Sequence, residues 1–144
     1  MLAALAFIAL TALHPPVAVA NVDGVPTALP RPAVVVLWAS WCVSCRAELR
    51  RIPELERAAK PLRVVTLAID PPAAARRALA AAGRPKVDAF ADAREPASVL
   101  ADWGGKGAAL PLTVAIDRNG QVCGTKRGLL GTDQLRQWAA RCSR

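Results

Sequence analysis

Apolar runs alternate with apolar positions at helical spacing along most of the chain, and this alternation predicts an α/β domain. The run Val34-Val35-Val36-Leu37 is uninterrupted and rich in β-branched residues, which is typical of a buried strand. Apolar residues then recur three or four positions apart, which predicts a helix whose buried face contains Leu49, Ile52, Leu55, Ala58 and Ala59. Because Pro53 lacks a backbone donor and clashes with the preceding turn, we expect this helix to kink there.

The alternation continues toward the C-terminus. We predict a second buried strand over 62–69, a helix over 73–82, a short strand over 86–91 and a helix over 95–103. Two strand-like runs then flank Asn119-Gly120, and Asn-Gly between such runs is a strong hairpin signal. The last helix is predicted to begin with Thr132 as its N-cap, and its apolar face contains Leu135, Trp138, Ala139 and Cys142.

The first 32 residues differ from the rest of the chain. Residues 1–20 contain an uncharged apolar run too short for an ordinary membrane span, and they end on Ala18-Val19-Ala20, a pattern typical of a signal-peptidase site. We interpret them as a signal peptide or, alternatively, as an uncleaved N-terminal anchor, and in both cases the domain is exported. Residues 21–32 are rich in proline, glycine and polar side chains, so we predict a lead-in loop before a domain that spans 33–144.

Composition and charge narrow the range of functions. A chain of 144 residues can bury one core, so we expect one domain. The formal net charge is +8, but the basic residues are scattered from Arg31 to Arg144 without a motif that reads nucleic acid, so we interpret them as solvated helix faces. The one histidine, His14, lies in the leader, which argues against Cys–His proteases and His-ligated metal enzymes.

Two cysteines, Cys42 and Cys45, lie where the first buried strand gives way to a helix. The first amides of a helix have no partner within it and the macrodipole adds positive charge there, so a Cys42 thiolate would be stabilised and its pKa lowered. Cys45 follows one turn later and can close a ring with Cys42. We therefore interpret Cys42 as a nucleophile toward disulfides and Cys45 as the resolving thiol. The alternative, half of a zinc site, normally needs a second ligand pair, and the other two cysteines stand alone.

The segment Trp38-Ala39-Ser40-Trp41-Cys42-Val43-Ser44-Cys45-Arg46-Ala47-Glu48-Leu49 resembles the active-site segment of the thioredoxin superfamily. It is most similar to the TlpA/ResA/DsbE branch of bacterial extracytoplasmic thiol–disulfide oxidoreductases, and the similarity extends in order from about Val34 to the last helix. The resemblance implies a thioredoxin-like α/β fold, with a central mixed β-sheet flanked by helices, a TlpA-type helix–strand insertion at about 71–92 and a shortened N-terminal hairpin region. The dipeptide Val43-Ser44 departs from the family, in which proline often precedes the second cysteine, so the reduction potential does not carry over.

The resemblance also implies a client-binding group beside the dithiol. Pro111 matches the cis proline that faces the dithiol in thioredoxin-fold proteins, and the alternative is an ordinary trans proline in a loop. Its expected role is to leave the backbone of Leu110 free to pair with a client polypeptide, as an added strand would. We expect Trp41 to cover one side of the dithiol.

Glu48 follows Cys45 by three residues, so both project from the same helix face. Members of the ResA branch carry a glutamate at the matching place, and we expect Glu48 to take and return the proton of the resolving thiol, with a pKa raised by partial burial. The alternative is a solvated glutamate on an arginine-rich helix.

The remaining cysteines are Cys123 and Cys142. Because Cys142 lies on the apolar face of the last helix and the expected compartment is oxidising, we predict a structural disulfide between them. The alternative is two separate small buried hydrophobic residues.

Together, these patterns and the resemblance predict an exported thiol–disulfide oxidoreductase. By resemblance its usual direction is reduction, with electrons from a membrane donor of the CcdA/DsbD kind and clients that include apocytochrome c. We expect a monomer in the periplasm, secreted or anchored to the inner membrane, that needs no organic cofactor, no metal and no nucleic acid. The alternatives are a dithiol oxidase or isomerase, a metal chaperone of the Sco type, and a non-catalytic binding domain of the same fold.

Overall fold

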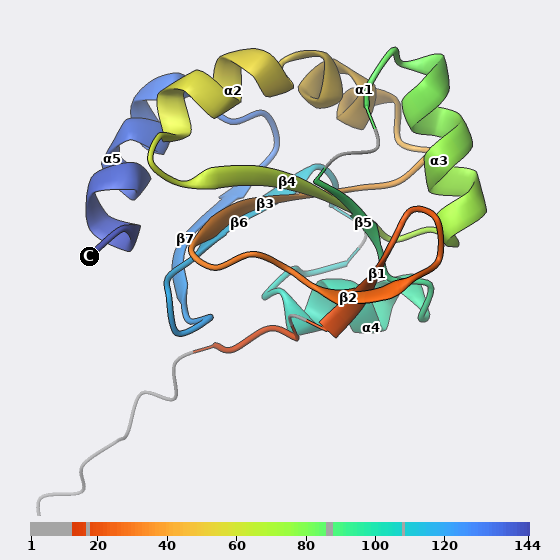
Figure 1. Ribbon diagram of the computed structural model, residues 1–144, viewed down its shortest axis with the longest axis horizontal. Helices are drawn as coiled ribbons and strands as arrows, with labels where there is room; N and C mark the ends of the chain where they lie inside the picture. Colours follow the sequence, from red (N-terminus) through yellow and green to blue (C-terminus); the bar gives the residue numbers. More distant parts are fainter. Residues whose placement is uncertain (1–12, 17, 86–87, 108) are drawn as a thin grey trace, which may run out of the picture.

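The structure is a computed structural model that describes residues 13–16, 18–85, 88–107 and 109–144 (Figure 1). Within these residues, seven strands form one mixed sheet in the order β2-β1-β5-β4-β3-β6-β7. The strands are β1 (Ala18–Asn21), β2 (Pro26–Ala28), β3 (Ala33–Trp38), β4 (Arg63–Ala68), β5 (Ala89–Ala91), β6 (Leu112–Ile116) and β7 (Val122–Arg127). The helices are α1 (Val43–Arg50), α2 (Ile52–Ala59), α3 (Pro72–Ala81), α4 (Pro96–Asp102) and α5 (Thr132–Cys142). This arrangement confirms the thioredoxin-like α/β fold expected from the sequence.

Strand β3 is the centre of the sheet, and it pairs in parallel with β4 and antiparallel with β6. Its six residues are all buried. Val34 and Val36 belong to a hydrophobic cluster shared with α2 and α5, whereas Val35 and Leu37 belong to a second cluster that contains residues of α3 and α4. Figure 1 shows α1, α2 and α5 above the sheet and α4 below it. Because both faces of β3 are covered, its sequence is apolar throughout instead of alternating.

The kink expected at Pro53 is present as a break between two helices. Helix α1 ends at Arg50, α2 begins at Ile52, and Arg51 between them has φ −87° and ψ −3°. Pro53 occupies the first turn of α2, where its missing N–H would have no partner within the helix in any case. The helix that carries the dithiol is therefore only eight residues long.

The helix–strand insertion expected at about 71–92 is also present. Helix α3 follows β4 and leads to β5, which pairs in parallel with β4. Residues 86 and 87 of the predicted strand lie outside the described residues.

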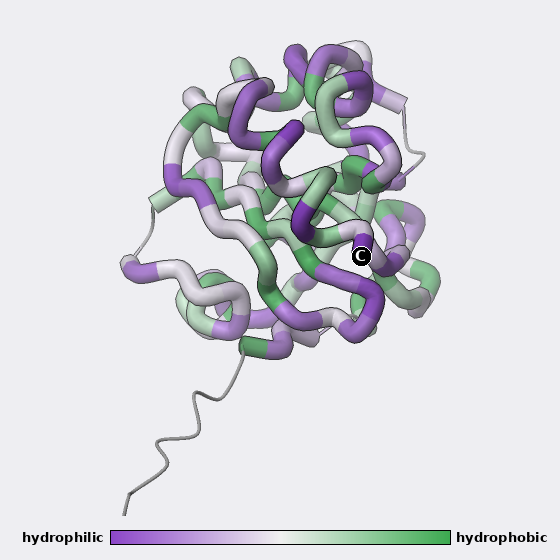
Figure 2. Tube along the Cα trace, turned by 90° about the vertical axis from the view of Figure 1, so that its left-hand side faces the viewer, coloured by the Kyte–Doolittle hydropathy of each residue, from purple (hydrophilic) through white to green (hydrophobic). Residues whose placement is uncertain are grey.

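Coloured by hydropathy, the trace passes through the centre of the molecule as hydrophobic segments, and hydrophilic residues recur in its outer segments (Figure 2).

The prediction of a loop over residues 21–32 was wrong, because part of this segment forms a hairpin. Strand β1 pairs antiparallel with β2 on one side and with β5 on the other. The turn between them is tight, since the Asn21 side chain accepts hydrogen bonds from the backbone N–H groups of Asp23 and Val25, and Gly24 adopts φ +84°. A tight turn leaves enough residues for two short strands, and β1 takes three of its four residues from the segment expected to be a leader.

Residues before β1 also contact the domain. Pro15 is buried, and the Val122 N–H of β7 donates to the Leu13 carbonyl (3.1 Å). Residues 1–12 and 17 of the predicted leader lie outside the described residues. Among the residues that are described, no helix has the length and apolar character needed to cross a membrane.

The N-cap of the last helix lies one residue before the predicted Thr132. Gly131, in extended conformation, is the N-cap of α5, and Thr132 is already its first helical residue. The predicted apolar face is confirmed, since its buried residues are Leu135, Trp138, Ala139 and Cys142. Helix α5 lies close to β7 at Gly124, where an added Cβ would be 2.4 Å from the indole ring of Trp138.

Candidate active site

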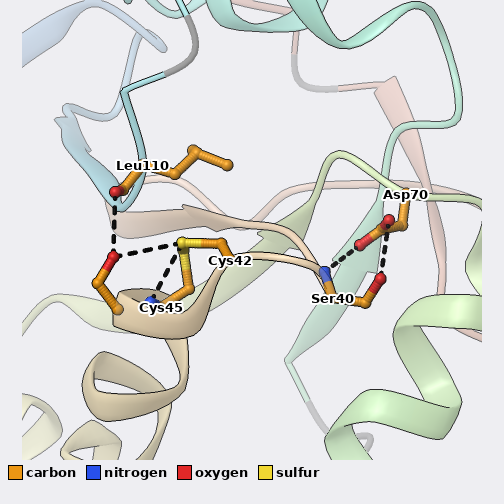
Figure 3. Close-up of a disulfide and its surroundings, with 6 residues drawn as sticks. Ser40, Cys42, Cys45, Asp70 and Leu110 are labelled. Carbon is orange, nitrogen blue, oxygen red and sulfur yellow. Dashed lines mark hydrogen bonds between the residues drawn. A yellow bond between two sulfur atoms is a disulfide. The ribbon is translucent and has the colours of Figure 1, made fainter.

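Cys42 and Cys45 lie at the junction between β3 and α1, as predicted, and they form a disulfide with a Cα–Cα distance of 5.3 Å (Figure 3). Cys42 is the N-cap of α1, and its sulfur accepts a hydrogen bond from the Cys45 N–H (3.2 Å). Cys42 is 7% exposed and Cys45 is 0% exposed. The site can therefore present one sulfur to an incoming thiol or disulfide while it protects the other.

The loop that leads to Cys42 is held from the end of the neighbouring strand. Asp70 follows β4 and is buried, and its carboxylate accepts hydrogen bonds from the Ser40 N–H (2.6 Å) and the Ser40 hydroxyl (3.2 Å) (Figure 3). A charge-assisted pair of this kind restrains the backbone two residues before the reactive sulfur. Asp70 was not among the site residues predicted from the sequence. A signal was nevertheless present, because the carboxyl ends of parallel strands meet at one edge of a sheet and an acid there faces the site.

The Leu110–Pro111 peptide bond is cis and lies at the start of β6, the other neighbour of β3. The Ser44 hydroxyl donates to the Leu110 carbonyl (3.4 Å) and is 3.5 Å from the Cys42 sulfur. Figure 3 shows the Leu110 carbonyl oxygen joined by a dashed line to this hydroxyl, which a second dashed line joins to the Cys42 sulfur. The fold thus brings together Cys42 and the Leu110–Pro111 pair, which are far apart in the sequence. In the sequence Ser44 stands out only as a departure from the family, and no local pattern indicates that it bridges these two segments.

Two apolar residues beside the dithiol face solvent. Trp41 is 57% exposed and Val43 is 80% exposed, whereas Trp38 is buried in the core. An exposed tryptophan next to the accessible cysteine offers an apolar contact surface for another polypeptide.

Glu48 is fully buried, which excludes the solvated alternative. Its carboxylate accepts hydrogen bonds from the Leu130 N–H (3.0 Å) and from Arg51 (3.2 Å), and Arg51 also donates to the Leu130 carbonyl (2.8 Å). Burial raises the pKa of Glu48 above its usual value, and the Leu130 hydrogen bond and the Arg51 charge oppose this effect without cancelling it. These contacts tie α1 to the loop before α5. Glu48 therefore has a structural role at the junction between α1 and the loop before α5.

Cys123 and Cys142, the second pair considered in the sequence analysis, are joined by a disulfide with a Cα–Cα distance of 5.8 Å. This bond connects β7 to α5, in the cluster on the α2–α5 side of the sheet. It is separate from the dithiol site.

Comparisons with known proteins agree with this fold. The family model described as Redoxin matches residues 28–135, more than half of the chain. Among solved structures, MTB dsbF in its mixed oxidised and reduced forms is 23% identical, with a TM-score of 0.65, and the match covers 88% of this chain and 94% of that one. A thio-disulfide isomerase from Thermus thermophilus is 25% identical, with a TM-score of 0.62 and coverage of 88% and 92%.

A third similar structure is that of a secreted Mycobacterium tuberculosis disulfide oxidoreductase homologous to E. coli DsbE. It is 18% identical, with a TM-score of 0.61, and the match covers 85% of this chain and 93% of that one. No curated protein matches the chain.

Proposed function

Because the chain belongs to the redoxin family, we propose that it is a thiol–disulfide oxidoreductase that acts on client proteins through Cys42 and Cys45. One observation carries this proposal: the two cysteines form a disulfide at the N-terminus of α1, beside the cis Leu110–Pro111 bond, with Cys42 slightly exposed and Cys45 fully buried. Unpaired helix amides and the macrodipole favour a thiolate at that position, and a thiolate is the species that attacks disulfides.

The exchange proceeds in two displacements. In the reduced protein the Cys42 thiolate attacks one sulfur of a client disulfide, and the second client sulfur leaves as a thiolate that takes a proton from water. Cys45 loses its proton and attacks the Cys42 sulfur of the mixed disulfide, which releases the first client sulfur and forms the Cys42–Cys45 bond. Two electrons pass to the client, and the oxidised protein returns to the form described above.

Three residues are proposed to bind the client beside Cys42. Leu110 is half-buried in the loop just before β6, and Pro111 after it has no N–H, so the Leu110 carbonyl is the group proposed to pair with the backbone of a client strand. The exposed ring of Trp41 would supply apolar contact. Glu48 is proposed to accept the proton of Cys45 during resolution, which its raised pKa supports.

We propose reduction as the direction, with electrons from a membrane donor of the CcdA/DsbD kind and apocytochrome c among the clients. An exported location is supported by the Cys123–Cys142 disulfide, since such bonds persist outside the cytosol, and by the description of a similar structure as secreted. We expect a periplasmic monomer. The nearest alternative is a dithiol oxidase or isomerase, since another similar structure is described as a thio-disulfide isomerase. A measured potential near those of strong oxidants would select this alternative.

For the N-terminus, we infer that residues 18–20 stay with the domain and that cleavage does not occur after Ala20. Such cleavage would remove three residues of β1, which pairs with both β2 and β5. We expect a variant that begins at residue 21 to unfold at lower urea concentration than one that begins at residue 13. Equal midpoints would favour a leader that is removed at Ala20.

The test of the proposed function is to trap the mixed disulfide. A Cys45→Ser variant, expressed in the native host, should accumulate covalent adducts with client proteins that dithiothreitol releases. The matched control is Cys42→Ser/Cys45→Ser, which should trap none. Absence of adducts, together with Cys42 alkylation no faster than that of free cysteine, would overturn the proposal.

A further inference from the structure

Ser44 lies between the two cysteines, in the first turn of α1, and its side chain is exposed. Its hydroxyl oxygen is 3.4 Å from the Leu110 carbonyl oxygen and 3.5 Å from the Cys42 sulfur. A serine hydroxyl has one proton to donate, so it can serve only one of these two acceptors at a time. The same hydroxyl thus lies between the reactive sulfur and the backbone proposed to bind clients.

The two redox states differ in which acceptor is stronger. In the disulfide, the Cys42 sulfur is neutral and a weak acceptor, so the carbonyl of Leu110 is the better partner. When two glutathione molecules reduce the bond, they leave as one glutathione disulfide; Cys45 becomes a thiol, Cys42 a thiolate, and one proton goes to water. Hydrogen bonds to an ionised acceptor are roughly twice as strong as those between neutral groups. Reduction therefore makes the Cys42 sulfur the preferred partner.

We propose that Ser44 is a positioning residue whose hydroxyl changes partner with the redox state of the dithiol. In the oxidised form it occupies the Leu110 carbonyl, and in the reduced form it stabilises the Cys42 thiolate and leaves that carbonyl free to accept an N–H from a client backbone. This inference rests on the proposed function, since it assigns a further residue to the same exchange. It gives the sequence Cys-Val-Ser-Cys a property that the proline often found before the second cysteine cannot supply, because proline has no hydroxyl.

The expected effect of removing the hydroxyl is partial. The Cys45 N–H, 3.2 Å from the Cys42 sulfur, stays in place when Ser44 is replaced, and the Ser44 side chain is accessible to water. We therefore expect Ser44→Ala to lower the acid dissociation constant of the Cys42 thiol roughly tenfold, because the thiolate loses one hydrogen bond at the low end of the range for charged groups. The exchange equilibrium with glutathione should move up to about tenfold toward the disulfide form.

The experiment follows the ultraviolet absorbance of the Cys42 thiolate during a pH titration of four proteins: the parent, Ser44→Ala, Ser44→Thr and Val43→Ala. Ser44→Thr keeps the hydroxyl and should titrate close to the parent. Val43→Ala changes the adjacent residue, 80% exposed, and should also titrate like the parent. If the Cys42 thiolate of Ser44→Ala titrated identically to that of the parent, the inference would be overturned.

A second measurement tests the change of partner. The carbonyl ¹³C chemical shift of Leu110 should differ between the oxidised and reduced forms of the parent and of Ser44→Thr, and most of that difference should be lost in Ser44→Ala. Equal differences in all three proteins would overturn the switch. Failure of the proposed function is distinguishable, because the parent protein itself would then titrate like free cysteine.

Discussion

The disulfide between Cys123 and Cys142 closes a loop whose contribution to stability can be worked out. The two residues are 19 apart in sequence, so the loop contains 20 residues when both are counted (19 + 1). In the chain-entropy model, a cross-link of this size lowers the entropy of the unfolded chain enough to raise the free energy of unfolding by about 3 kcal/mol at 25 °C.

The folded state should survive loss of this bond. Arg141 donates to the Cys123 carbonyl (2.8 Å), and Gly124 lies directly against the Trp138 ring, so β7 and α5 remain in contact without the sulfur bridge. Most of the effect should therefore arise in the unfolded chain. If reduction lowered the free energy of unfolding by far more than 3 kcal/mol, the packing between β7 and α5 would itself depend on the disulfide.

The assay uses a Cys42→Ser/Cys45→Ser background, in which Cys123 and Cys142 are the remaining cysteines of the four. Urea unfolding is measured on this one polypeptide with and without dithiothreitol, so that no cavity is introduced. With a urea dependence of about 1–3 kcal/mol/M, the midpoint should fall by roughly 1–3 M on reduction. The control carries Cys123→Ala/Cys142→Ala in addition and should not respond to the reductant. A midpoint unaffected by dithiothreitol in the disulfide-containing protein would refute the reasoning.

Three further predictions concern single residues. Gly124→Ala should lower the free energy of unfolding by about 1–3 kcal/mol, because its Cβ would overlap the indole ring of Trp138 in α5. In the same denaturation series Gly131→Ala, with open space at its Cβ, should lower it by less, about 0.5–1 kcal/mol, because alanine is a poorer N-cap than glycine. Asp70→Ala should lower the free energy of unfolding by about 2–3 kcal/mol, because the Ser40 N–H and hydroxyl lose their acceptor. Asp70→Asn, which keeps an acceptor oxygen, should be closer to the parent. Equal urea midpoints for Asp70→Ala and the parent would contradict this prediction. The folded pKa of Glu48 is raised, so its contribution to stability is fully present below about pH 4.5 and is lost as the pH rises through the folded value. Glu48→Gln should therefore gain stability relative to the parent as the pH rises through that window, and parallel pH profiles would argue against a perturbed carboxyl.

Much of the site could be predicted from local sequence. The apolar run of β3, the following helical spacing and the Cys-x-x-Cys between them place the dithiol at a helix N-terminus without any tertiary information, because strand and helix periodicity are properties of neighbouring residues. The Asn-Gly hairpin and the apolar face of the last helix are local in the same sense.

The N-terminal hairpin could not be assigned in this way. Residues 18–20 read as the end of a leader because small apolar residues suit both a peptidase site and an edge of a sheet. Only the pairing of β1 with β5, a strand some 70 residues further along, decides between the two. Strand pairing joins residues that are distant in the sequence, so it cannot be predicted from the neighbouring residues of either strand.

The chain's own pattern of residues determined a cysteine at the start of a helix, a second cysteine one turn away and a proline ahead of a distant strand. Tertiary structure decided which groups surround them. Asp70 accepts a hydrogen bond from the loop before Cys42, and buried Glu48 accepts one from the Leu130 N–H. The Ser44 hydroxyl lies between the Cys42 sulfur and the Leu110 carbonyl. The reason is physical: helix and strand formation depend on contacts a few residues apart, whereas hydrogen bonds at the edge of a sheet join residues that only the folded chain makes neighbours.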